Sequence, residues 1–440
     1  MACKASPASG RKSAALTKTT RVSRISGFHK LTPAERLEAV AAFAGLEDSD
    51  RQQLAAPGNL DADLADHMIE NMVTTIAIPV GVAANLKIDG VDVLAPMATE
   101  ESSVIAAVSN SARQCYEAGG FTTSMSGMEM IAQIQLLDLP DPERTRLTIL
   151  ERREEIAEIC NDCDPMLVRL GGGFRSVEAR VLDTDGGRMV VTHLIVDTRD
   201  AMGANAVNTM AERLAPRLAE WTGGRPLLRI LSNLADRRLA RARAVWPVDA
   251  IGGAGVRDAM IAAFHFADAD PYRAATHNKG IMNGVSAVVL ATGNDTRAVE
   301  AGAHAYAARD GRYRSLSRWE VTAEGHLSGM IEMPMAVGLV GGATKLHPTA
   351  RALIAVAGCD TAEGLARLIA AVGLAQNFGA MKALATDGIQ KGHMALHASN
   401  VAIDAGAVGD EIAMVAARLV EARSVNVNEA RSVLAELRSR

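Results

Sequence analysis

Residues 271–307 have the sequence PYRAATHNKGIMNGVSAVVLATGNDTRAVEAGAHAYA, around which we expect the rest of the chain to be organised. It predicts a glycine-flanked turn that carries Lys279, a short apolar strand over 286–290, and a Gly-Asn-Asp turn whose Asp295 opens a small-residue helix. A lysine held near a carboxylate beside a strand can stabilise developing negative charge. The plainer interpretation is that Asp295 only caps its helix and Lys279 is solvated, and spacing alone favours it.

Composition restricts the class of protein. The chain has 440 residues, of which 48% are hydrophobic and only 3% aromatic, so we expect two or three globular domains with cores of small and aliphatic side chains. Residues 1–30 carry seven Lys and Arg and no acid, which leaves the remainder at -12 against -5 for the whole chain. An acidic body argues against nucleic acid as the main ligand. Residues 1–28 are predicted to be a basic, disordered tail.

Neither a membrane span nor a metal site is expected. We find no run of about eighteen apolar residues, which a spanning helix needs. The five cysteines are scattered, which suits the reducing cytoplasm. Cys160 and Cys163 have C-x-x-C spacing, but no second ligand pair lies near them in sequence, and the pair formed by His393 and His397 is far away. We therefore predict no metal.

The pattern of elements predicts an α+β fold with an inserted domain. Strand-like and helix-like segments alternate over 127–237, whereas 29–126 and 238–389 are mostly helical and form a larger, discontinuous domain. Residues 390–440 follow as further helices. We expect a strand over 75–82, one polar helix over 142–159, and separate helices over 361–373 and 375–386. No G-x-G-x-x-G follows a strand, so a Rossmann dehydrogenase is disfavoured.

Several strings agree, in order, with one family. The chain resembles class II, the soluble bacterial form, of 3-hydroxy-3-methylglutaryl-coenzyme A (HMG-CoA) reductase over roughly residues 29–430. The strings are IENM at 69, ATEESS at 98, DAMGAN at 200, ILSNLAD at 230, DPYRAATHNKGIMNG at 270, GNDTRAVEAGAHAYA at 293, VGLVGGATK at 337 and GHMALHA at 392. The resemblance implies a large substrate domain, an inserted dinucleotide-binding domain, a mobile C-terminal flap over 390–440 and an intertwined homodimer or higher even oligomer.

The resemblance also assigns residues. The family's catalytic positions fall on Glu101, Lys279, Asp295 and His393, and its substrate-binding positions fall on Ser103, Arg273 and Asn283. Its cofactor positions fall on Asp164, Asp200, Met202, Gly203, Asn205 and Asn233. One departure is visible: relatives often have Glu-Pro-Ser where this chain has Glu101-Ser102-Ser103, and loss of the proline removes a backbone restraint.

The implied reaction is the four-electron interconversion of HMG-CoA with mevalonate and coenzyme A, in isoprenoid metabolism. Asp164 falls where an acid faces the adenosine ribose, and an acid there accepts hydrogen bonds from the 2′-hydroxyl and repels a 2′-phosphate, so NADH is expected and NADP is disfavoured. Gly203, at a predicted helix N-terminus, offers free backbone N–H groups to a phosphate. The alternative is a non-catalytic acyl-CoA or nucleotide-binding protein of the same fold.

Overall fold

The computed structural model describes residues 21–440 except 57, 59, 387–397, 423 and 440. Most of the chain packs around a six-stranded sheet in the order β2-β1-β3-β8-β10-β9, and its neighbours pair antiparallel apart from β1 and β3. The strands are β1 (Val80–Ile88), β2 (Val91–Ala98), β3 (Phe121–Met125), β8 (Leu239–Trp246), β9 (Ser317–Val321) and β10 (Leu327–Pro334).

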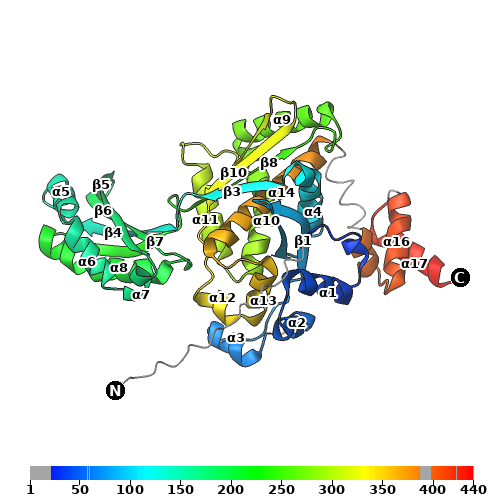
Figure 1. Cartoon of the computed structure of the whole chain (residues 1–440), viewed down its shortest axis with the longest axis horizontal. Helices are drawn as coiled ribbons and strands as arrows, with labels where there is room; N and C mark the ends of the chain where they lie inside the picture. Colours follow the sequence, from blue (N-terminus) through cyan, green and yellow to red (C-terminus); the bar gives the residue numbers. More distant parts are fainter. Residues whose placement is uncertain (1–20, 57, 59, 387–397, 423, 440) are drawn as a thin grey trace, which may run out of the picture.

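Helices pack around this sheet in the central and largest part of the molecule (Figure 1). They are α1 (Pro33–Ala44), α2 (Asp48–Ala55), α3 (Ala62–Met68), α4 (Val104–Cys115), α9 (Ala254–Ala269), α10 (Pro271–Ala291), α11 (Thr296–Ala307), α12 (Gly342–Leu346), α13 (Pro348–Ala357) and α14 (Ala362–Ala385). Trp246 of β8 stacks on Phe378 of α14 with ring centroids 4.5 Å apart, at the centre of the apolar core. A few large aromatic contacts thus support a core otherwise built of small and aliphatic residues and methionine.

The prediction of a turn and a strand around Lys279 was wrong, because residues 271–291 form the single helix α10. Asp270 caps its start by accepting a hydrogen bond from the backbone N–H of Arg273, and Pro271 takes the first position. Asn278, interpreted as a turn residue, is buried and bonds to the 314–316 segment instead of its own backbone. The apolar run over 286–290 is the buried part of a helix, which periodicity alone does not distinguish from a strand.

Three other boundaries differ from prediction. The separate helices expected over 361–373 and 375–386 are one helix, α14, because it is buried on nearly all sides and two of its glycines, Gly373 and Gly379, lie against α10 and α4. The polar helix over 142–159 is two, α5 (Pro142–Glu151) and α6 (Arg153–Asn161), which meet at a non-helical Arg152. The strand expected from 75 starts at Val80, since residues 72–79 have no strand partner.

Helix α14 is the one helix in the described part of the chain that is long and apolar enough, by length and composition, to cross a membrane. However, 67% of its apolar window is buried inside the protein, where it packs on α10, α4 and β8. Core packing therefore accounts for its composition.

A second sheet, with its own apolar core, lies to one side (Figure 1). Its strands pair antiparallel in the order β5-β6-β4-β7. They are β4 (Glu129–Leu137), β5 (Gly173–Thr184), β6 (Gly187–Asp197) and β7 (Arg225–Ser232), and they pack with α5, α6, α7 (Pro165–Arg169) and α8 (Ala204–Thr222). The predicted α+β class is confirmed.

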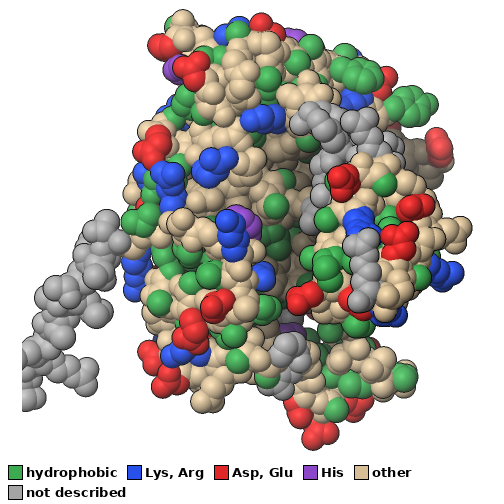
Figure 2. All heavy atoms as spheres, turned by 90° about the vertical axis from the view of Figure 1, so that its right-hand side faces the viewer, with side chains coloured by type: hydrophobic (Ala, Val, Ile, Leu, Met, Phe, Trp, Pro, Cys, Tyr) green, Lys and Arg blue, Asp and Glu red, His purple; other side chains and the backbone are tan. Residues whose placement is uncertain are grey.

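Both ends of the described chain carry specific contacts. Ser23, inside the predicted tail, is fully buried with its hydroxyl 2.8 Å from Leu86 O and 2.6 Å from Asp92 Oδ1. At the other end, residues 398–404, α16 (Asp410–Glu421) and α17 (Val427–Arg438) share a small apolar core. Figure 2 looks onto this side, where a hollow runs down the face with Lys and Arg side chains beside it. His393 lies outside the described residues.

Candidate active site

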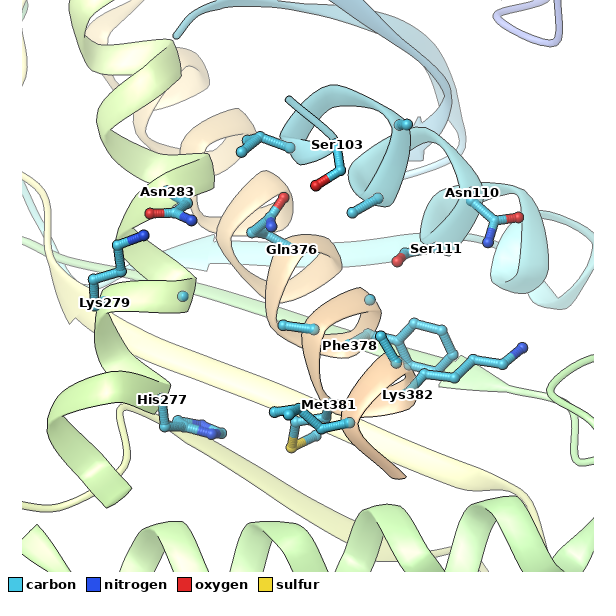
Figure 3. Close-up of a pocket in the computed structure, with 18 of the residues that line it drawn as sticks. Ser103, Asn110, Ser111, His277, Lys279, Asn283, Gln376, Phe378, Met381 and Lys382 are labelled. Carbon is cyan, nitrogen blue, oxygen red and sulfur yellow. The ribbon is translucent and has the colours of Figure 1, made fainter. Parts of the chain in front are cut away.

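A cleft of about 660 Å³ lies between α4, α10 and α14 (Figure 3). Ser103 comes from the start of α4, Lys279 and Asn283 from α10, and Gln376 and Lys382 from α14. Its size suits a small organic ligand. The charged side chains that line it are three cations, Arg273, Lys279 and Lys382, and one carboxylate, Glu101. The cleft therefore favours an anionic ligand.

Lys279 is held at one end of this cleft. Its Nζ donates to Glu101 Oε2 at 3.1 Å, and Asn283 Nδ2, one turn further along α10, donates to the same oxygen at 3.2 Å. Positions four apart on a helix share a face, which is why the two donors reach one acceptor. The Lys279 side chain is 61% exposed and Glu101 is 39% exposed, so the ammonium retains free donors for a ligand.

A smaller hollow of about 280 Å³ adjoins the cleft and is also lined by Glu101, Lys279 and Asn283. Its remaining lining includes Thr296 and Glu300 at the start of α11, where Glu300 accepts a hydrogen bond from Ser286 of α10 at 2.7 Å. The Lys279–Glu101 pair thus borders both hollows.

Arg273, in the first turn of α10, also lines the cleft. Burial lowers the pKa of its guanidinium. Within the described chain no hydrogen bond or ion pair engages that guanidinium; only the Arg273 backbone N–H is used, in capping α10. A partly desolvated guanidinium without a protein partner is suited to bind a ligand carboxylate.

Ser103, at the N-cap of α4, has a φ of 75° and caps no backbone N–H with its side chain. A non-glycine residue in this left-handed region costs about 1 kcal/mol or more, and such conformations cluster at functional sites. The conformation leaves its hydroxyl in the cleft wall, as Figure 3 shows.

His277 lines the cleft and was missed by the sequence reasoning. It is buried, and burial, followed by the charge of Arg273, lowers its pKa to about 3, so the ring is neutral. Trp319 donates to Asn377 Oδ1 at 3.0 Å, which orients the amide so that Asn377 Nδ2 donates to His277 Nε2 at 3.1 Å. The proton therefore sits on Nδ1. A single histidine beside a lysine motif carries no sequence signal for this network.

Asp295 is the N-cap of α11, so the capping interpretation is confirmed. Its Oδ1 accepts from the backbone N–H of Arg297 and of Ala298 at 2.9 and 3.1 Å. Burial alone would raise the pKa of this carboxyl, but the hydrogen bonds from Arg297 and Ala298 outweigh it and hold the pKa below its usual range. No hydrogen bond or ion pair joins Asp295 to Lys279 in the part of the chain described, and its catalytic role stays a prediction.

The predicted cofactor residues lie in loops and helix starts beside the second sheet, and none of them is in one of its strands. Asp164 caps α7 through Leu167 N, and Asp200 accepts a hydrogen bond from Ala362 N at the start of α14. Gly203 is the N-cap of α8 with a φ of 102°, and a Cβ there would lie 2.4 Å from Thr198 Cγ2. Met202 and Asn205 flank it, and Asn233 lies in the loop between β7 and β8. Their cofactor roles stay predictions.

No group of three or more His, Cys, Asp or Glu that could hold a metal occurs among the described residues. Cys160 and Cys163 are free thiols, and burial raises the pKa of Cys160 to about 12. A thiol with that pKa is unreactive near neutral pH.

Together these features define an α+β protein with a second, smaller sheet. The charged lining of its cleft is mostly cationic, and the lysine in it is held by a carboxylate and an amide. Such a site suits an enzyme that acts on an anionic carbonyl compound. The sequence model of the hydroxymethylglutaryl-coenzyme A reductase family matches residues 32–398. The 3-hydroxy-3-methylglutaryl-coenzyme A reductase of Archaeoglobus fulgidus is 55% identical over 417 residues, 95% of each chain.

Solved structures agree. A 3-hydroxy-3-methylglutaryl-coenzyme A reductase from Streptococcus pneumoniae matches with a TM-score of 0.81 at 38% identity, over 94% of this chain and 99% of that one. The class II enzyme of the same organism, bound to NADPH in open conformations, matches with a TM-score of 0.80 at 38% identity, over 82% and 99%. The chain therefore belongs to the HMG-CoA reductase family of oxidoreductases.

Proposed function

We propose that the protein catalyses the NAD(H)-dependent four-electron interconversion of HMG-CoA with mevalonate and coenzyme A. The observation that carries the proposal is Lys279, held by Glu101 and Asn283 at the end of a cleft whose charged lining is mainly cationic. HMG-CoA is an anionic thioester, which is the chemistry such a cleft suits. Two reduced dinucleotides, bound one after the other, would each supply one hydride, the first to the thioester and the second to the resulting aldehyde.

Lys279 stabilises the carbonyl oxygen in both reduction steps. Negative charge grows on that oxygen as each hydride arrives, and a nearby ammonium in a cleft stabilises it more strongly than water does. Glu101 orients the ammonium through their 3.1 Å contact and, when protonated, gives the oxygen its proton. Asp295 is proposed as the second carboxylate that keeps the lysine charged.

The coenzyme A thiolate that leaves between the two reductions needs a proton. Histidine is the side chain that exchanges protons most readily near neutral pH, and His393 is proposed as the donor from the family position alone. In this proposal residues 390–440 act as the flap that closes over bound ligands, with His393 within it.

Arg273, Ser103 and Asn283 are proposed to hold the hydroxymethylglutaryl group. The unpaired guanidinium of Arg273 supports this role, since it can take the free carboxylate of the substrate in a bidentate pair. The strained backbone of Ser103 supports a fixed hydroxyl in the same wall.

The dinucleotide is proposed to bind at the loops and helix starts beside the second sheet, at Asp164, Asp200, Met202, Gly203, Asn205 and Asn233. NADH is proposed over NADPH because Asp164 would repel a 2′-phosphate. A related class II enzyme is described as bound to NADPH, so the preference needs a direct test.

We also propose a cytoplasmic homodimer. The segment that precedes β1 leaves Val73 and Ile76 with 91% and 89% of their surface exposed, and a second copy of the chain would cover such side chains. The alternative, a non-catalytic acyl-CoA or nucleotide-binding protein of the same fold, gives no reason for the Lys279–Glu101–Asn283 arrangement.

The test is absorbance at the nicotinamide band with purified protein and HMG-CoA, run once with NADH and once with NADPH. We expect two NADH oxidised per coenzyme A released, and much slower oxidation of NADPH. Preference for NADPH would overturn the role of Asp164 and keep the reaction. If neither dinucleotide is oxidised, and mevalonate, coenzyme A and NAD are also inert, the binding-protein alternative replaces the enzyme.

A further inference from the structure

The segment 337–340 lies between the loop that carries Asp295, the proposed second catalytic carboxylate, and the loop 200–203, which the proposed function assigns to the dinucleotide. On one side, Gly338 N donates to Asn294 Oδ1 at 2.8 Å, and Asn294 directly precedes Asp295. On the other side, Leu339 N donates to Asp200 O at 2.8 Å, and Val340 forms an isolated parallel bridge with Ala201. The segment is therefore hydrogen-bonded both to the loop before α11 and to the loop 200–203.

Gly338 permits this contact because it has no side chain. A Cβ at this position would lie 2.4 Å from Met202 N, 2.9 Å from Ala201 C and 3.1 Å from Asp200 O. All three are backbone atoms, so they cannot rotate away as the end of a flexible side chain could. Any side chain here would move the loop 200–203 by several tenths of an ångström relative to the segment.

Arg238 joins segment 337–340 and loop 200–203 through hydrogen bonds from inside the protein. It is fully buried, and its guanidinium donates to Ala201 O at 3.0 Å and also to Val337 O. Asp200 Oδ1 in turn accepts from Ala362 N at 2.8 Å, which fixes the loop to the start of α14. The loop 200–203 is thus held by backbone contacts and buried hydrogen bonds. Because these contacts are closely packed, a small shift of segment 337–340 moves the loop by a similar amount.

We infer that segment 337–340 sets the position of the dinucleotide loop 200–203 relative to Asp295, and that Gly338 and Asn294 are positioning residues for the hydride donor. The inference rests on the proposed function. Hydride transfer requires reacting atoms about 3–3.5 Å apart, so a displacement of several tenths of an ångström between the dinucleotide and the substrate matters. If Gly338 and Asn294 were only structural, replacing them would lower Tm but would not change the affinity for NADH more than the affinity for HMG-CoA.

The experiment compares Gly338→Ala and Asn294→Ala in the full chain with a matched control, Gly255→Ala. Gly255 lies in α9, its φ is outside the left-handed range, and a Cβ there would meet nothing within 4 Å. Calorimetry gives the Kd of NADH and, separately, that of HMG-CoA, and thermal unfolding gives Tm. Asn294→Ala removes only one side-chain acceptor and carries the test if Gly338→Ala does not fold.

We expect the Kd of NADH to rise about tenfold in Gly338→Ala and less in Asn294→Ala, with HMG-CoA affinity within about twofold of wild type. The control should match wild type for both ligands. Unchanged NADH affinity in both variants, or equal losses for NADH and HMG-CoA, would overturn the inference. If wild type and control bind no dinucleotide at all, the proposed cofactor fails, and the inference fails with it.

Discussion

Replacing Lys279 with methionine should reduce the reaction rate far more than it reduces stability, because the lysine contributes little to the free energy of unfolding and much to stabilising the transition state. The Lys279 and Glu101 side chains are 61% and 39% exposed, so their ion pair is screened by water and contributes about 0.5 kcal/mol to the free energy of unfolding. Loss of a donor to a developing oxyanion costs about 3–4 kcal/mol, a hundredfold to a thousandfold in rate. Methionine keeps most of the side-chain volume, so packing on α10 changes little.

The assay measures kcat for HMG-CoA reduction and, separately, for reduction of mevaldehyde, together with Tm. Both rates should fall at least about a hundredfold, since Lys279 acts on the carbonyl oxygen in each step, and Tm should move by no more than about 2 °C. Lys30→Met, at an exposed lysine outside the cleft, is the control and should match wild type in both measurements. Wild-type rates in Lys279→Met would refute the reasoning, as would a loss of activity that follows a large fall in Tm.

Four further predictions follow from particular residues. Asp295→Asn should keep Tm within about 2 °C, because Asn caps a helix about as well as Asp, while activity falls; retained activity would exclude a need for the charge. The pKa of His277 is depressed to about 3 in the folded state, so below pH 6.5 the unfolded chain binds more protons than the folded one. The free energy of unfolding should therefore decrease as the pH falls from 6.5 to 5, by up to about 1.4 kcal/mol per pH unit. His277→Asn should show a shallower slope over that range, measured by denaturant unfolding, and equal slopes would contradict the burial argument. His393→Gln should slow thioester reduction more than mevaldehyde reduction, and equal losses would remove it from thiolate protonation. Deletion of 1–20 should leave activity and Tm intact, whereas deletion of 1–28 should lower Tm, and equal Tm values would show that the contacts of residues 21–28 add no stability.

Sequence reasoning located the charged residues of the site better than the elements that carry them. The resemblance placed Glu101 and Lys279 among the catalytic positions and Asn283 among the substrate-binding positions, and the structure joins all three side chains through one carboxylate oxygen. The helix that carries two of them was interpreted as a turn and a strand. Gly280 was interpreted as a turn residue but lies within α10, and Gly284 of the same helix lies where a Cβ would be 2.8 Å from Gln376 Cβ, so it allows α10 and α14 to approach closely.

The parts that sequence could not predict depend on contacts distant along the chain. The tautomer of His277 is set by Asn377, which is oriented in turn by Trp319, and no local pattern connects these three residues. The close approach of Gly338 to the loop at Met202 likewise joins segments more than a hundred residues apart. Local sequence propensity predicts neither the His277 tautomer nor the Gly338 contact, because both depend on how distant segments pack in the folded protein.

Asp295 shows why the capping and catalytic interpretations could not be separated by spacing, and why they do not exclude each other. The two backbone N–H groups at the start of α11 both bond to Oδ1, and so does Arg297 Nε at 3.2 Å. Among the described residues Oδ2 accepts only from Arg297 Nη2, at 3.4 Å, and that side chain is 91% exposed. Capping therefore fixes the rotamer of the carboxylate through one oxygen, and the other is held only by a solvent-exposed arginine that another cation could replace. A charge held in advance costs less to orient during the reaction than a mobile one, so the helix cap itself would prepare Asp295 for a catalytic role.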